Sequence, residues 1–137
     1  MKKYIGIKQI EAEPMEKDGK EGYRVQYPDG YVSWSPKEAF EEAYSEVGKN
    51  PLYDTSLLMK SKDFKDRFRA EYYQLENRYQ GLKKMLESYK NGTLPFKPLC
   101  NYELLYEQLI HMGNYAKTLD ERATIEGIEL DSESEDK

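Results

Sequence analysis

The apolar residues between Phe64 and Tyr89 recur with helical spacing along the whole segment. Intervals of four, four, three, four, three, four and three residues separate them. Because residues three or four apart share one face of an α-helix, this spacing predicts an amphipathic helix of about seven turns. Asn91 and Gly92 predict its end. The members of the stripe are Phe64, Phe68, Tyr72, Leu75, Tyr79, Leu82, Leu86 and Tyr89.

A second apolar stripe follows Asn101, which is expected to cap another helix. Gly113 interrupts this stripe at some cost in helix stability. Two long helices joined by about ten residues should pack antiparallel. A lone hairpin exposes half of each stripe, so either the N-terminal part of the chain or a second subunit should cover the rest. The second stripe consists of Leu105, Leu109, Met112, Ala116, Leu119 and Ala123.

Tyrosines are concentrated on the two predicted helices. They are Tyr72, Tyr73, Tyr79, Tyr89, Tyr102, Tyr106 and Tyr115. Large side chains with one polar end suit interfaces whose rims stay wet. This pattern favours a homo-oligomer, with a dimer as the expected form. The alternative is a monomer whose core is lined with tyrosines because their hydroxyls reach water at its edge.

The segment from Gly22 to Trp34 predicts a β-hairpin. Apolar and polar residues alternate on both sides of Asp29 and Gly30, a pair typical of tight turns. A two-residue loop there would pair Val25 with Trp34 and gather the apolar side chains on one face. We prefer this loop because a three-residue loop would scramble that face.

Two further elements are expected near this hairpin. A strand is predicted from Tyr4 to Ala12, with a bulge or break where the apolar phase slips. A short helix is predicted from Pro36 to about Glu46. Ser35 would be its N-cap in a capping box, with proline at the first helical position. This helix should cover the face that carries the valine and the tryptophan.

The fold class is therefore α+β, with a small N-terminal antiparallel β-sheet and one short helix, followed by a long antiparallel two-helix hairpin. We expect a β-β-β-α module over residues 1–47, a linker over 48–59, the hairpin over 60–127 and an acidic tail over 128–137 that is disordered from residue 131. The lone Cys100 fits a reducing compartment, and we see no signal peptide and no membrane-spanning stretch.

Catalytic patterns are poorly represented. The chain has one histidine and one cysteine, and we find no phosphate-binding glycine loop and none of the common hydrolase or zinc motifs. We expect His111 to be partly buried and hydrogen-bonded rather than a ligand. Three metal ligands cannot be assembled around it or Cys100. The prediction is a protein without enzymatic activity, cofactor or metal.

Binding is the remaining class, and the charge distribution supports it. The net charge is -5, yet residues 60–90 hold nine Lys or Arg against five Asp or Glu, a local balance of +4. Guanidinium groups clamp phosphates and aromatic rings stack on bases. The alternative is that each of these residues is a solvated side chain or part of a surface salt bridge. The predicted ligand-binding residues are Arg67, Tyr72, Gln74, Arg78, Asn114, Tyr115 and Arg122.

The N-terminal third resembles a module of small tailed-phage accessory proteins. The matching pieces are Lys3-Tyr4-Ile5-Gly6, Ala12-Glu13-Pro14-Met15, Gly22-Tyr23, Asp29-Gly30-Tyr31 and Ser33-Trp34-Ser35-Pro36-Lys37-Glu38. In that family the module is also joined to domains like the second Thoeris anti-defence protein, which sequesters nucleotide immune signals. Residues from about 64 to 122 instead resemble a helical hairpin of crAss-like phage accessory proteins, through Gln108-Leu109, Met112, Tyr115, Leu119 and Arg122.

Two functions from different classes follow from these observations. The first is a phage counter-defence protein in the host cytoplasm that binds and sequesters a nucleotide immune signal, either a cyclic oligonucleotide or an ADP-ribose derivative. The second is a protein-binding inhibitor or adaptor that acts on a host defence protein, as an anti-CRISPR does, through the hairpin and the acidic tail. A membrane or duplex nucleic acid is not an expected partner.

Overall fold

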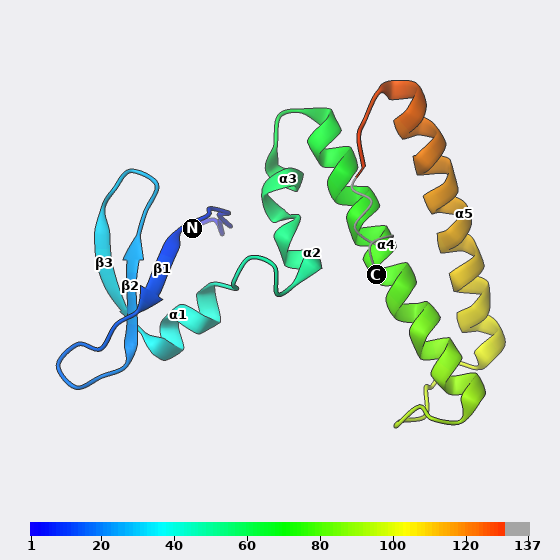
Figure 1. The fold of residues 1–137 in the computed structure, drawn as a ribbon, viewed down its shortest axis with the longest axis horizontal. Coiled ribbons are helices and arrows are strands. Elements are labelled where there is room, and N and C mark those ends of the chain that lie inside the picture. The colour runs from blue at the N-terminus through cyan, green and yellow to red at the C-terminus, as the bar shows by residue number, and fades with distance from the viewer. Residues whose placement is uncertain (131–137) are drawn as a thin grey trace. The chain divides into compact units, whose positions relative to one another are not determined.

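The structure, a computed structural model, describes residues 1–130, and the chain divides into two compact units, Met1–Lys60 and Ser61–Lys137 (Figure 1). The first unit contains a three-stranded antiparallel sheet and short helices. The second contains two long helices. The expected α+β class and the two-helix hairpin are confirmed.

The sheet has the order β1-β2-β3, and all its pairs are antiparallel. Its strands are β1 (Glu11–Pro14), β2 (Gly22–Gln26) and β3 (Val32–Pro36). Three short helices follow, α1 (Lys37–Ala43), α2 (Pro51–Asp54) and α3 (Ser56–Lys60). The last two occupy the segment that was expected to be a linker.

The hairpin between β2 and β3 has a three-residue loop, so the predicted register is wrong by one residue. Arg24, and not Val25, pairs with Trp34. Gly30 has φ 92°, the left-handed conformation that closes such a loop. Pro28 suits the first position of this turn because its ring fixes φ at about -65°. The Asp-Gly pair therefore ends a longer turn instead of forming a two-residue one.

The corrected register puts Val25 and Trp34 on opposite faces of the sheet. Val25 is only 1% exposed. Tyr23 lies on the same face, and its ring stacks on Phe40 of α1 with the centroids 4.2 Å apart. Helix α1 therefore packs on the face that carries the valine, and the tryptophan is not part of that core.

On the other face, the Trp34 ring lies over Gly22. A Cβ built on Gly22 would be 2.4 Å from that ring and from the Ser35 carbonyl oxygen, so the backbone at this position leaves no room for a side chain. The indole N–H donates to the Met15 carbonyl at 2.8 Å. Trp34 is therefore half-buried, and its ring and its indole N–H both contact residues of the same unit.

The strand predicted from Tyr4 to Ala12 is wrong over most of its length, since pairing begins at Glu11. The cause is the length of β2. Ala12 pairs with Val25, so the residues before β1 would have to pair with the chain where it already turns at Tyr27. They lack a neighbouring strand.

The capping box is also wrong. The helix begins at Lys37, and its N-cap is Pro36, which makes no side-chain capping bond. The Lys37 N–H instead donates to the Glu21 carbonyl at 3.1 Å, which continues the β2–β3 ladder into the first helical residue. Ser35 pairs within the sheet and cannot cap the helix.

The second unit consists of α4 (Phe64–Asn91) and α5 (Tyr102–Glu126), which pack as the predicted hairpin. Asn101 caps α5 as predicted, accepting from the Leu104 N–H at 2.8 Å, and Gly92 ends α4 with φ 73°. Among residues 1–130, none of the helices is long and apolar enough to cross a membrane.

The core of this unit joins both helices and the residues that follow them. It contains Phe68, Leu75, Leu119, Ala123 and Ile128. Ile128 is only 5% exposed, so the core of the hairpin extends into the first residues of the segment that was predicted to be the acidic tail. Lys65 and Arg69 of α4 donate to the carbonyls of Gly127 and Glu129, at 3.4 and 2.8 Å. The predicted disorder of residues 131–137 lies outside the described residues.

Candidate functional site

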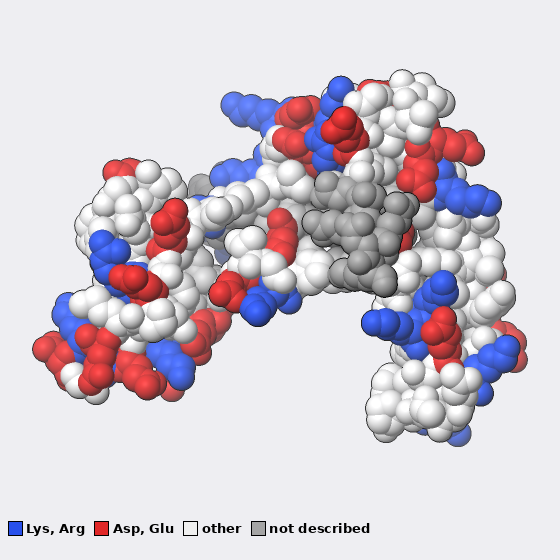
Figure 2. Space-filling view, viewed as in Figure 1, with Lys and Arg blue, Asp and Glu red and all other residues white. Residues whose placement is uncertain are grey.

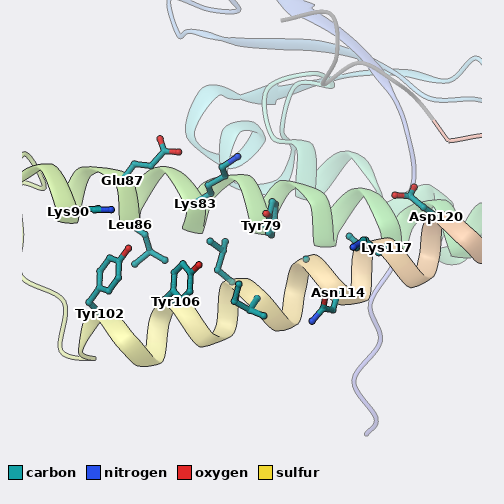
Figure 3. Close-up of a pocket in the computed structure, with 14 residues that line it drawn as sticks. Tyr79, Lys83, Leu86, Glu87, Lys90, Tyr102, Tyr106, Asn114, Lys117 and Asp120 are labelled. Carbon is teal, nitrogen blue, oxygen red and sulfur yellow. The ribbon is translucent and has the colours of Figure 1, made fainter.

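A groove of about 610 Å³ runs between α4 and α5 on one side of the hairpin (Figure 3). Gly113 of α5 leaves space for an aromatic ring of α4 beside the groove. The Tyr79 ring lies against Gly113, and a Cβ built there would be 3.3 Å from the ring. The groove is lined by Tyr79, Lys83, Leu86, Glu87, Lys90, Tyr102, Tyr106, Leu109, Ile110, Gly113, Asn114, Ala116, Lys117 and Asp120.

Aromatic rings form one wall of the groove. Tyr102 and Tyr106 are one turn apart on α5, and their rings stack with centroids 6.0 Å apart and an interplanar angle of 14°. Figure 3 shows both side chains rising from α5 toward Leu86 of α4. Tyr106 is 47% exposed, so one ring of the pair remains open to a ligand. Tyr89 supports the other ring from α4, at 5.5 Å between centroids.

Three lysines supply the charge. Lys83 and Lys90 come from α4 and Lys117 from α5. Over residues 1–130, no carboxylate lies within ion-pair distance of any of these three ammonium groups. Two acidic residues, Glu87 and Asp120, also line the groove, which leaves it with three positive and two negative groups. Its cations are thus available to an anion.

The acidic residue at one end of the groove has a partner. Asp120 accepts a hydrogen bond from the Tyr72 hydroxyl of α4. Burial of the phenol, together with the nearby Asp120 charge and this bond, raises the pKa of Tyr72 to about 12. The tyrosine therefore stays protonated at neutral pH and can donate to this carboxylate.

None of the four predicted residues of α4 lines this groove, although Tyr72 contacts Asp120 at its end. Arg67 is exposed and donates to the Ser61 carbonyl at 2.6 Å. Arg78 is also exposed, and Gln74 is half-buried. Tyr72 packs against the core of the hairpin. The structure does not gather these four side chains into one cavity.

The predicted residues of α5 are divided among three places. Asn114 lines the groove. Tyr115 is 44% exposed and does not line it. Arg122 lies over the Phe68 ring, 5.0 Å from its centroid, and donates to Glu126 at 2.8 Å. Tyr72 and Arg122 thus contact the same hydrophobic core cluster and pack against it.

The groove residues that sequence reasoning did not select are the three lysines and the tyrosines Tyr79, Tyr102 and Tyr106. The sequence spacing could have grouped two of the lysines, because Lys83 and Lys90 are seven residues apart and thus share a face of α4. Lys117 could be joined to them only by knowing how the two helices align.

His111 was expected to be partly buried, and this is wrong. Its side chain is 73% exposed and lies 3.6 Å from a Glu107 carboxylate oxygen on the same helix. No cluster of possible metal ligands occurs within residues 1–130.

Charges on the visible face of the molecule are mixed. In Figure 2 basic and acidic side chains alternate over both units outside the grey residues. Duplex nucleic acid requires a broad basic surface. A local groove with a few cations suits a small anion better.

A hairpin with one groove of stacked rings and ammonium groups has the features of a small-ligand binding protein. Residues 62–125, which include both long helices and their connection, match the model of the family Sequestin. The family name suggests a sequestering protein. The match does not extend to the N-terminal module. No curated protein and no solved structure matches the chain.

Proposed function

We propose that the protein is a non-enzymatic phage counter-defence protein that sequesters a nucleotide immune signal in the groove between α4 and α5. The ligand is a cyclic oligonucleotide or an ADP-ribose derivative, and the protein acts in the host cytoplasm. The observation that carries the proposal is that Lys83, Lys90 and Lys117 line the same groove as the stacked tyrosines, inside the segment that matches a sequestering family.

The chemistry of the groove complements a nucleotide. Ammonium groups without a carboxylate partner attract phosphate oxygens, and an exposed ring offers a platform for a base. Stacking a base on an aromatic side chain contributes about 1 to 3 kcal/mol. The volume of about 610 Å³ falls within the range of small-molecule sites.

The test is a thermal-shift and calorimetric screen against cyclic dinucleotides, cyclic trinucleotides and ADP-ribose derivatives. At a hundredfold excess over its Kd, a ligand should stabilise the fold by about 2.7 kcal/mol. Lys83→Ala and Lys117→Ala should each weaken binding. Lys84→Ala is the matched control, because Lys84 is exposed on the same helix but does not line the groove.

Equal loss of binding in the Lys83 and Lys84 variants would mean that only the overall charge of the helix matters. Binding that is insensitive to both lysines and lost in Arg78→Ala would place the ligand at the arginines of α4. No shift with any nucleotide would contradict the proposal.

A second candidate is supported by the outer face of α5. Leu104 and Tyr115 are about three helical turns apart on one side of α5 and are 54% and 44% exposed. Such a stripe suits a host protein bound through the hairpin, as the adaptor hypothesis requires. Tyr115→Ala should then weaken capture of a host protein without changing nucleotide binding.

A further inference from the structure

The first six residues form an exposed segment, here called the N-terminal arm. Tyr4 and Ile5 are 90% and 94% exposed, and no strand of residues 1–130 pairs with the arm. Tyrosine and isoleucine favour strands, so the arm exposes apolar side chains to water and has backbone groups free to pair with another strand.

The base of the arm is fixed to its own unit. The Lys60 ammonium donates to the Ile7 carbonyl at 3.2 Å. The Lys8 ammonium lies 4.5 Å from the centroid of the Tyr27 ring. These contacts hold the chain just before β1 and leave residues 1–6 to extend beyond it.

The same unit has an open sheet edge on β3. The Tyr27 N–H donates to the Tyr31 carbonyl at 2.8 Å, and the alternation of an antiparallel ladder then directs the main-chain groups of the serines of β3 toward β2. Val32 and Trp34 therefore direct their N–H and C=O groups away from the sheet. Within residues 1–130 these groups have no strand beside them.

We propose that the N-terminal arm of a second copy adds to the open edge of β3. The arm of the same copy leaves from the β1 side, and β2 lies between β1 and β3. An arm of six residues spans about 20 Å, enough to pair with the outward groups of Val32 and Trp34. Val32 is 41% exposed, and Ile5 supplies an apolar side chain to cover it.

Charge favours an antiparallel arrangement. In that direction Lys2 and Lys3 of the arm lie at the end of β3 that leads into α1. This helix carries three glutamates, Glu38, Glu41 and Glu42, and one lysine. The opposite direction would move the two lysines of the arm away from these carboxylates.

Two copies that exchange their arms reciprocally in this way close as a two-fold dimer. The proposal does not depend on the groove of the hairpin. It names a different interface from the tyrosine-rich helices that the sequence favoured.

Sedimentation velocity of the full chain over a range of concentrations tests the interface. The wild type should reach a dimer. Ile5→Asp on the arm and Val32→Lys on the edge should each raise the dimer dissociation constant at least about tenfold. Val47→Lys is the control, because Val47 is 69% exposed in the same unit but belongs to neither partner of the exchange.

Circular dichroism of each variant shows whether the sheet is retained, and Ile5 makes this check simple because it has no neighbours to lose. A wild type that is monomeric at every concentration would overturn the proposal. A dimer that survives Ile5→Asp would also overturn it. If Tyr115→Asp dissociates that dimer, the interface lies on the hairpin.

Discussion

The Tyr79 ring of α4 packs against Gly113 of α5, where an added Cβ would approach its Cε2 to 3.3 Å. The glycine that seemed to weaken the second helix is thus the position at which the partner helix inserts an aromatic ring. It allows the groove to have a tyrosine at its floor.

Alanine at the two helical glycines of the hairpin should have different effects. Gly81→Ala should stabilise the hairpin by about 1 kcal/mol, because a Cβ there meets nothing within 4 Å and alanine favours the helix. Gly113→Ala should gain clearly less, since the Tyr79 ring must shift. Urea unfolding followed by circular dichroism measures both. Equal gains would show that the ring contact carries no energy.

Alkaline pH should weaken the hairpin through Tyr72. Its pKa is raised from 10.0 to about 12, so the folded state holds the phenol proton more tightly than the unfolded chain. The stabilisation is complete below pH 10 and is lost as the pH rises toward 12. Tyr72→Phe should remove this part of the loss. The free energy of unfolding of the wild type and of Tyr72→Phe, measured between pH 10 and 12, checks this prediction. Identical pH profiles of the two proteins would contradict it.

Val25→Ala should destabilise the N-terminal unit by about 1 to 3 kcal/mol, because it removes a side chain that is 1% exposed. Val32→Ala, at an exposed position of the neighbouring strand, should change the stability of the monomer, measured at high dilution, by less than about 0.5 kcal/mol. Trp34 is the one tryptophan of the chain, so its fluorescence reports on this unit alone. Similar losses in both variants would contradict the observed register.

Tyr106→Ala should weaken nucleotide binding by about 1 to 3 kcal/mol, which is the contribution of one stacked base. Tyr115→Ala is the matched change on the outer face of the same helix and should leave the affinity unaltered. Isothermal titration calorimetry with the ligand found in the screen compares them. A larger effect at Tyr115 would move the site out of the groove.

The long helices could be predicted because their information is local. The spacing from Phe64 to Tyr89 and the cap at Asn101 are visible within single segments, and both are confirmed. The sheet was harder. Pro28 and Gly30 together favour a three-residue loop, but an Asp-Gly pair alone resembles a two-residue turn, and that one-residue difference moves Trp34 to the other face.

The groove lay beyond sequence reasoning for a different reason. Lys83 and Lys117 belong to different helices, and their placement beside one groove depends on how α4 aligns with α5. Charge counting pointed to α4 as a basic helix, but it did not distinguish Lys83 from Lys84, or either from the arginines. The stacked pair of Tyr102 and Tyr106 was noticed only as part of an interface-like surface.

The carbonyls of Gly127 and Glu129 accept from Lys65 and Arg69, so the C-terminal end of α5 is tied to the first turns of α4. The connection between the helices joins them at their other end. Because the two helices are joined at both ends, they cannot separate at one end. The width of the groove is therefore fixed before a ligand binds. A captured molecule would then lose little affinity to ordering the protein around it.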